Sequence, residues 1–290
     1  MMNTALQSLI DRYRPETSSE WENALREIVQ ELALLGLWRS KFYQHAAFYG
    51  GTALRIFHGL PRFSEDMDFS LLEPDRNFDL NPHLEAVRVE LAGFGFTFEI
   101  DRKVKAADTA IESAFLKGNS RINLLEVGAP ESLRDQFPRS KKLKIKLEVD
   151  TDPPPGADYE VETLLVPIPF QVKLFTLPGL FAGKVHALLC RNWKGWVKGR
   201  DFYDFVWYLG REVPCHLAHM QKRLEQTGHW DPATELDLET LRIRLAERFA
   251  SVDFEQAKND VRPFIRDPDE LALWSREFFV ELVDRLVEST

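Results

Sequence analysis

Apolar residues near the start of the chain recur with a helical period and then give way to a short strand pattern. Between residues 20 and 38 they fall on one face of a 3.6-residue repeat, which predicts a helix with a buried stripe. The apolar run at 45–49 predicts a strand, and the glycine-rich turn at 50–52 leads into a short helical pattern at 53–57. The chain therefore opens with a helix followed by a strand, turn and helix.

The character of the pattern changes twice along the rest of the chain. After a strand at 67–72 and a helix at 82–91, strand patterns prevail as far as residue 166. These strands are expected at 94–100, 121–127, 143–149 and 159–166. Beyond Pro178 only amphipathic helices are expected, at 178–192, 200–210, 214–226, 236–251 and 269–287. We therefore predict a mixed α/β domain over residues 1–176 and a helical domain over residues 177–290.

Two acids stand two residues apart at the start of the predicted strand 67–72. Side chains at that spacing point to the same face, so Asp66 and Asp68 project together while Met67 and Phe69 point into the core. Mg²⁺ takes one or two carboxylates together with substrate phosphates, which fits such a pair. An exposed strand end with solvated acids shows the same spacing, so the pair alone does not decide between the two interpretations.

Two other segments can join this pair. The turn Gly50-Gly51-Thr52 lies between a strand and a helix, where backbone N–H groups can hold phosphate. A tight turn with no binding role is also compatible with these residues. The strand at 144–150 alternates cleanly, with Lys146, Glu148 and Asp150 on its polar face. That face is either the wall of an active site or the solvated side of an antiparallel strand.

A stretch of 17 residues, from Lys184 to Arg200, carries cations and two tryptophans but no acid. Its members are Lys184, Arg191, Trp193, Lys194, Trp196, Lys198 and Arg200. Such a composition fits contact with an RNA backbone and stacking on bases. The helix that follows places Arg200, Asp201, Asp204 and Tyr208 on the face opposite its apolar stripe. Acids in the first turn of a helix also interact favourably with the helix dipole, so a purely structural role for Asp201 and Asp204 stays open.

Composition limits the function classes. The 37 basic and 46 acidic residues give a net charge of −9, which argues against a protein that coats nucleic acid through bulk charge. Two cysteines, Cys190 and Cys215, are too few for a disulfide framework, and no zinc-binding spacing is present. No secretory signal or bilayer-length apolar run is found. We therefore expect a soluble, cytoplasmic protein with no membrane partner.

Five motifs in a fixed order resemble one known family. They are Gly50-Gly51-Thr52-Ala53-Leu54-Arg55, Arg62-Phe63-Ser64-Glu65-Asp66-Met67-Asp68-Phe69, Lys144-Ile145-Lys146-Leu147-Glu148, Ala182-Gly183-Lys184-Val185-His186-Ala187 and Lys198-Gly199-Arg200-Asp201-Phe202-Tyr203-Asp204. Together they resemble the AbiEii/AbiGii nucleotidyltransferase toxins of the DNA polymerase β-like superfamily, which include the mycobacterial MenT toxins. The resemblance runs from about residue 48 to residue 209.

The resemblance implies an α+β, polymerase β-like nucleotidyltransferase fold, in which a small mixed sheet is flanked by helices and a helical C-terminal part completes the active site. It also implies a Mg²⁺-dependent nucleotidyltransferase, with Mn²⁺ as an alternative ion. Such an enzyme transfers a nucleoside monophosphate from an NTP to an RNA 3′ end, with the tRNA acceptor stem as the target, and so blocks translation. A cognate antitoxin, of winged-helix type, is the implied protein partner.

Roles carry over to the matching positions. The implied catalytic residues are Asp66, Asp68, Glu148, Lys184 and Asp201. The implied nucleotide-binding residues are Gly50, Gly51, Thr52, Ser64, Lys146, Lys184, Arg200 and Asp204. The implied metal ligands are Asp66, Asp68 and either Glu148 or Asp150. In this scheme Asp201 positions either Lys184 or the base. The chain departs from the family pattern in a slightly long gap of 14 residues between Gly51 and Asp66, and in Gly183, where many relatives carry an acid.

Two alternatives stay open at this point. The same fold can transfer the nucleotide to a small molecule or a protein side chain, or the chain can be a binding module that holds an NTP without catalysis and docks a partner. Label from an NTP would follow a non-RNA acceptor in the first case. In the second, an Asp66→Ala, Asp68→Ala double variant would keep full biological activity.

Overall fold

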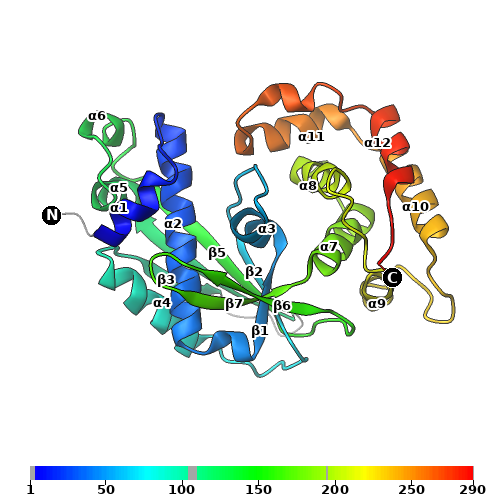
Figure 1. Cartoon of the computed structure of the whole chain (residues 1–290), viewed down its shortest axis with the longest axis horizontal. Helices are drawn as coiled ribbons and strands as arrows, with labels where there is room; N and C mark the ends of the chain where they lie inside the picture. Colours follow the sequence, from blue (N-terminus) through cyan, green and yellow to red (C-terminus); the bar gives the residue numbers. More distant parts are fainter. Residues whose placement is uncertain (1–3, 104–109, 194, 290) are drawn as a thin grey trace. The chain divides into compact units, whose positions relative to one another are not determined.

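The protein is seen in a computed structural model that describes residues 4–103, 110–193 and 195–289. Its internal contacts form two compact units (Figure 1). The first unit comprises Met1–Thr52, Glu65–Pro153 and Val161–Leu174, and the second comprises Ala53–Ser64, Pro154–Glu160 and Phe175–Thr290. The predicted division into domains at residue 176 stays a prediction. Among the helices of the described residues, none has the length and apolar character needed to cross a bilayer.

The first unit is built on a seven-stranded sheet with the order β3-β4-β5-β2-β1-β7-β6 (Figure 1). Its strands are β1 (Ala46–Tyr49), β2 (Met67–Leu71), β3 (Glu99–Lys103), β4 (Ile111–Asn119), β5 (Lys142–Asp150), β6 (Tyr159–Leu164) and β7 (Phe170–Phe175). Strand β2 pairs antiparallel with β1 and parallel with β5, so the sheet is mixed. The predicted α+β fold, with a mixed sheet flanked by helices, is confirmed.

Helix α2 (Ser18–Arg39) is the long helix of this unit, and it packs against α4 and contacts β5 (Figure 1). It begins with a capping box in which Thr17 and Glu20 satisfy each other's backbone N–H groups. Its predicted apolar stripe is buried, including Ile28 and Leu32. The other helices that begin in this unit are α1 (Thr4–Asp11), η1 (Phe42–Gln44), α3 (Gly50–His58), α4 (Asn81–Gly93), α5 (Ser120–Glu126) and α6 (Glu131–Arg134).

Two predicted strands of this unit are corrected. The segment predicted as a strand at 121–127 is helix α5, because Asn119 caps it by accepting a hydrogen bond from the backbone N–H of Ile122. A short apolar run is compatible with either element, and the cap decides between them. The strand predicted at 94–100 begins only at Glu99, since Phe94 ends helix α4. The prediction also missed strands β4 and β7.

The second unit is helical around a cluster of phenylalanine rings. Phe202 contacts Phe249, Phe254 and Phe279 with ring centroids 5.3 to 5.5 Å apart, which joins α8, α10, α11 and α12. A Cβ at Gly199 would overlap the carbonyl oxygen of Ala257, so α8 and α11 cross closely at a glycine. The helices are α7 (Leu177–Cys190), α8 (Gly199–Leu209), α9 (Leu217–Gln226), α10 (Leu238–Ala250), α11 (Phe254–Val261), η2 (Arg262–Phe264), η3 (Pro268–Leu271), α12 (Arg276–Leu282) and η4 (Val283–Arg285).

The single helix predicted at 269–287 is wrong, because the segment is divided into η3, α12 and η4. Ser275 interrupts it by capping α12 through a hydrogen bond from the backbone N–H of Phe278. Helices α1 and α11 were not predicted from the sequence. The other helices predicted for the second unit are present within a few residues of their expected ends.

Two histidines of the second unit make its stability depend on pH. Burial, and then the charge of Arg223, lower the pKa of both His186 and His219 to about 4. Both side chains are therefore neutral in the folded state at pH 7. Above the unfolded pKa of about 6.5 they do not lower the free energy of unfolding. As the pH falls toward 4 the free energy of unfolding declines, by about 1–2 kcal/mol per histidine at pH 5.

Urea unfolding at pH 7 and pH 5 tests this prediction. We expect His219→Gln to lose less of its free energy of unfolding between the two pH values than the unsubstituted protein. Equal losses in the two proteins would show that His219 does not titrate in the way its burial requires.

Candidate active site

The turn between β1 and α3 is shaped around the carboxylate of Asp68. Gly50 has φ of +82°, a backbone conformation that favours glycine. Tyr49, the last residue of β1, is the register partner of Asp68 on β2. A Cβ at Gly50 would lie 2.5 Å from Oδ2 of Asp68. The predicted glycine turn and the predicted acid are therefore brought together, with the carboxylate lying over the turn.

Gly50→Ala is expected to destabilise the protein by about 1–3 kcal/mol. The new Cβ would overlap the Asp68 carboxylate, and alanine would have to adopt the positive φ that glycine has at this position. Gly93→Ala is the matched control in the same unit, since a Cβ there meets nothing within 4 Å. Urea unfolding of the two variants is the measurement. Equal stability of both variants would contradict the close approach.

The acids of β2 and β5 lie side by side in the sheet. Asp68 is the register partner of Glu148, and Ser70 is the partner of Asp150. Asp150 is therefore displaced along the strand from Asp68, while Glu148 is directly beside it. Lys146 forms an ion pair with Glu148, with 2.6 Å between Nζ and Oε1. Of the two candidate third acids, Glu148 is therefore the one directly beside Asp68.

The same Oε1 of Glu148 accepts a hydrogen bond of 3.3 Å from Oγ of Ser113 on β4. Ser113 is the register partner of Glu148, so the serine also lies on this face of the sheet. The sequence prediction missed Ser113 because strand β4 was itself missed.

Backbone anchors hold the segment that carries Asp66. The hydroxyl of Thr52 donates to the carbonyl oxygen of Asp66, and Thr52 is fully buried. Nε2 of Gln30 on α2 donates to the carbonyl of Glu65 at 3.1 Å, and Arg26 pairs with the Glu65 carboxylate at 3.6 Å. Thr52 therefore orients the acid segment through its side chain. Gln30 and Arg26 were missed because helical spacing says nothing about long-range partners.

Lys184 of α7 lies between the two acids of α8 in the second unit. Its Nζ is 2.8 Å from Oδ1 of Asp201 and 2.8 Å from Oδ2 of Asp204. Arg62 pairs with Asp204 through two parallel hydrogen bonds, of 2.5 Å from Nε and 2.6 Å from Nη2. Arg191 approaches Oδ2 of Asp201 at 3.5 Å. The sequence placed Lys184 in one motif and Asp201 and Asp204 in the next, but it gave Arg62 no role.

These charges are buried and compensate one another. Asp201 and Asp204 are at most 1% exposed, although the sequence placed them on the polar face of α8. Burial acts to raise the pKa of Asp201, but Lys184, Arg191 and Lys198 outweigh it and lower the pKa to about 2. Burial acts to lower the pKa of Lys184, but the two aspartates raise it overall. Asp201 therefore stays ionised and Lys184 stays charged at neutral pH.

Arg200 has different partners from the other cations. Its Nε lies 3.8 Å from Oδ2 of Asp260, and its guanidinium carbon is 4.1 Å from the centroid of the Phe264 ring. Asp260, on α11, was not identified from the sequence.

Ser64 and Gly51 are half-buried. Lys194 lies outside the described residues.

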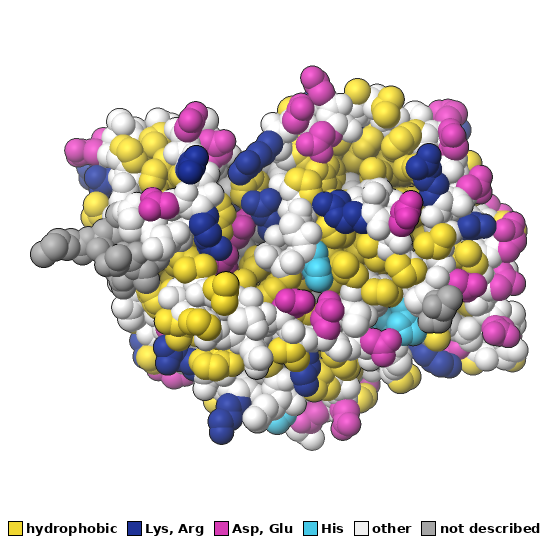
Figure 2. All heavy atoms as spheres, viewed as in Figure 1, with side chains coloured by type: hydrophobic (Ala, Val, Ile, Leu, Met, Phe, Trp, Pro, Cys, Tyr) yellow, Lys and Arg dark blue, Asp and Glu magenta, His cyan; other side chains and the backbone are white. Residues whose placement is uncertain are grey.

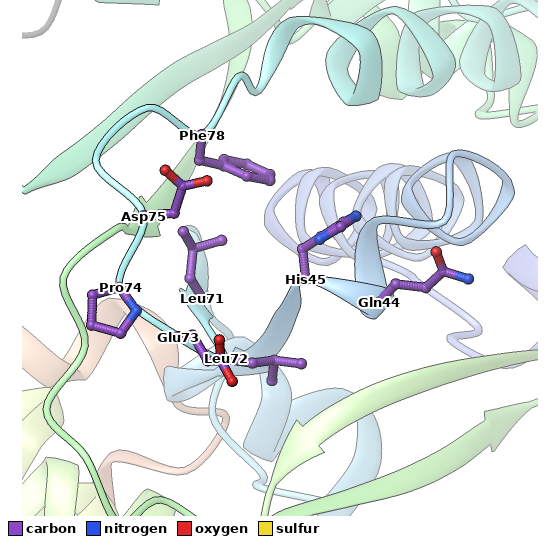
Figure 3. A pocket seen from close by; sticks show the side chains of 8 residues that line it. All are labelled: Gln44, His45, Leu71, Leu72, Glu73, Pro74, Asp75 and Phe78. Carbon is purple, nitrogen blue, oxygen red and sulfur yellow. The ribbon is translucent and has the colours of Figure 1, made fainter.

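A separate cavity of about 360 Å³ lies at the other end of the β1–β2 pair (Figure 3). It is lined by Gln44, His45, Leu71, Leu72, Glu73, Pro74, Asp75 and Phe78. Because Ala46 pairs with Leu71 while Tyr49 pairs with Asp68, this cavity and the Gly50 turn lie at opposite ends of the two strands. None of the predicted site residues lines it.

The described carboxylates of the first unit are of the type that binds a divalent ion, but they do not form a complete set of ligands. Among the residues that the structure describes, no group of three or more His, Cys, Asp or Glu side chains is arranged to hold a metal. Asp68 beside Glu148, with Asp66 two residues ahead, offers carboxylate oxygens of the type that Mg²⁺ prefers. Mg²⁺ takes one or two carboxylates and completes its shell with water and substrate phosphates. The donor chemistry therefore fits, and the three-carboxylate set stays a prediction.

A sequence model of the family described as nucleotidyl transferase AbiEii toxin, of a type IV toxin–antitoxin system, matches residues 32–281. The chain belongs to the AbiEii family. The matched span contains all the candidate site residues named from the sequence, and it confirms the resemblance drawn from the five motifs. Membership in the AbiEii family implies nucleotidyltransferase activity, an NTP substrate and an antitoxin partner.

Two crystal structures of Helicobacter pylori proteins are similar to this AbiEii-family chain. One, of a protein assigned as a nucleotidyltransferase, has 17% identity over 89% of this chain and 94% of its own, with a TM-score of 0.48. The other, of JHP933, has 17% identity over 89% of this chain and 91% of its own, with a TM-score of 0.46. Comparison with curated proteins gave no match. The family assignment rests on the family model.

Proposed function

We propose that the chain transfers a nucleoside monophosphate from an NTP to the 3′ end of an RNA, with the tRNA acceptor stem as its target, and thereby blocks translation. The observation that carries the proposal is the placement of Asp68, which lies over the Gly50 turn and directly beside Glu148 in the sheet. A glycine turn whose backbone N–H groups can hold phosphate is then next to acids of the type that hold a divalent ion. Family membership supports the reaction class.

In the proposed reaction the RNA 3′ oxygen forms a bond to the α-phosphorus, and the bond from the α-phosphorus to the oxygen that bridges to the β-phosphorus breaks. Pyrophosphate leaves, and Glu148 accepts the hydroxyl proton. If Glu148 completes the metal site instead, the proton passes to water. Asp66 and Asp68 are the proposed ligands of Mg²⁺ or Mn²⁺, which, when bound, supplies positive charge to the triphosphate. Asp150 is the alternative third acid.

The proposed contacts to the triphosphate are a glycine turn and two lysines. Backbone N–H groups of the Gly50-Gly51 turn hold phosphate, and Thr52 fixes the Asp66 segment. Lys146, which pairs with Glu148, and Lys184, which is held by Asp201 and Asp204, neutralise the triphosphate. Ser64 and Arg200 are further proposed contacts to the nucleotide. Asp201 acts as a positioning residue for Lys184.

The distribution of charge is compatible with contact to one RNA end. On the face shown in Figure 2, acidic and basic side chains are interspersed in small groups rather than gathered into a large field of either sign. The net charge of −9 still argues against indiscriminate binding of nucleic acid. We propose a cytoplasmic enzyme neutralised by its cognate antitoxin, for which the winged-helix type stays a prediction.

The test of the acceptor uses each of the four NTPs labelled at the α-phosphate, with Mg²⁺ and total tRNA. We expect label to enter tRNA with at least one nucleotide. Periodate oxidation of the tRNA destroys the terminal cis-diol and is the matched control, which should accept no label. Label that enters a protein or small-molecule fraction instead would overturn the RNA proposal and support the alternative acceptor.

A further inference from the structure

The two tryptophans of the segment between α7 and α8 differ in what covers them. The guanidinium carbon of Arg248 lies 3.7 Å from the centroid of the Trp193 ring, and Arg248 also donates to the carbonyl oxygens of Leu188 and Arg191. Trp193 is therefore part of the packing between α7 and α10. Trp196 is 65% exposed, among the most exposed large apolar side chains in the described residues.

The exposed ring of Trp196 is held in place by a buried acid. Its Nε1 donates to Oδ1 of Asp260 at 2.8 Å, and Asp260 is only 8% exposed. The backbone N–H of Arg200 donates to the other oxygen of Asp260 at 3.4 Å, and that of Val197 donates to Oε1 of Gln256 at 3.4 Å. The indole itself and the backbone that follows it, at Val197 and Arg200, are thus bonded to α11, which holds the ring against that helix.

The chemistry around this ring selects its partner. The only polar atom of the indole is already bonded, so the exposed surface that Trp196 offers is an aromatic face. Between residues 191 and 200 the chain carries several cations, including Arg191 and Lys198, and no acid. A partner that brings a flat aromatic group and negative charge together is a single-stranded nucleic acid, whose bases stack on aromatic side chains while its phosphates meet cations.

We propose that Trp196 is a stacking platform for an unpaired base at the 3′ end of the RNA acceptor, with Arg191 and Lys198 contacting its phosphates. This inference rests on the proposed function and deepens it, because it names the residue that would recognise the single-stranded end. Asp260 is then a positioning residue, which orients the indole without touching the RNA.

The test measures RNA binding without NTP, by fluorescence anisotropy of two 5′-labelled hairpins. One hairpin ends in a four-nucleotide unpaired 3′ tail, and the other has the same stem and a blunt end. For Trp196→Ala we expect affinity for the tailed hairpin to fall by about 5- to 150-fold, the range for loss of one base–aromatic stack. Affinity for the blunt hairpin should stay unchanged. Trp196→Phe should recover much of the loss, because it restores an aromatic face.

Trp38→Ala is the matched control, since Trp38 is also exposed, at 39%, but belongs to the first unit. It should bind both hairpins like the unsubstituted protein, and thermal melting checks that each variant folds. Equal affinity of Trp196→Ala and the unsubstituted protein for the tailed hairpin would overturn the inference, even if nucleotide transfer occurs. Equal weakening of both hairpins would also overturn it. Tail-dependent binding without any label transfer would leave the platform in place and reject the proposed function.

Discussion

The Asp68→Asn variant is expected to transfer nucleotide about 10³-fold more slowly than the unsubstituted protein, a loss of about 4 kcal/mol in transition-state stabilisation. Asparagine keeps the shape of the side chain over the Gly50 turn but removes the negative charge that a divalent ion requires. Initial rates of label transfer from NTP to tRNA, at saturating Mg²⁺, are the measurement. The thermal midpoint should change little.

Asp75→Asn is the matched control, because it makes the same chemical change at an exposed position in the first unit. Its rate should equal that of the unsubstituted protein. Glu148→Gln should slow transfer more than Asp150→Asn, since Glu148 is the register partner of Asp68. An Asp68→Asn rate within tenfold of the unsubstituted rate would remove this acid from the catalytic centre.

The second large effect is on stability. Arg62→Leu is expected to lower the free energy of unfolding by about 3–5 kcal/mol, because it removes one partner of a buried ion pair and leaves Asp204 with less compensation. Urea unfolding at pH 7 is the measurement. The Arg62→Leu, Asp204→Leu double variant should be destabilised by less than the sum of the two single variants, since neither charge is then left behind.

Two results would count against this account of Arg62. Additive losses in the double-mutant cycle would mean that Arg62 and Asp204 do not interact energetically. A small loss in Arg62→Leu would mean that Lys184 alone compensates Asp204. The exposed pair Arg88 and Glu85 is the matched control, and replacing both by alanine should leave the unfolding curve unchanged.

Local patterns predicted the elements whose apolar residues recur with a clear period along the sequence. Helix α2 and strand β5 alternate apolar and polar residues at 3.6 and 2 residues, and both were predicted close to their observed bounds. Strand β4 alternates equally well in its burial, but its inward positions include Ala114 and Gly118, which carry little hydrophobic signal. Helix α5 was mistaken for a strand because its cap, Asn119, lies outside the apolar run.

The candidate site was predictable only where its residues share a motif. The spacing of Asp66 and Asp68 and the alternation around Glu148 gave the acids, and pairing of neighbouring strands brings them together. Arg62 was quoted within a motif, but its partner Asp204 lies 142 residues away. Asp260 and Gln30 belong to helices with no motif of their own. Partners of this kind depend on tertiary packing, which periodicity does not encode.

The most direct test of the central claim follows the two ends of the triphosphate in one reaction. Parallel incubations with Mg²⁺ and tRNA use the same NTP labelled at either the α- or the γ-phosphate, with the unsubstituted protein and with Asp68→Asn. The account predicts that α-label enters tRNA, that γ-label appears only in pyrophosphate, and that Asp68→Asn slows both by about 10³-fold. Transfer of γ-label to an acceptor, or full α-label transfer by Asp68→Asn, would contradict it.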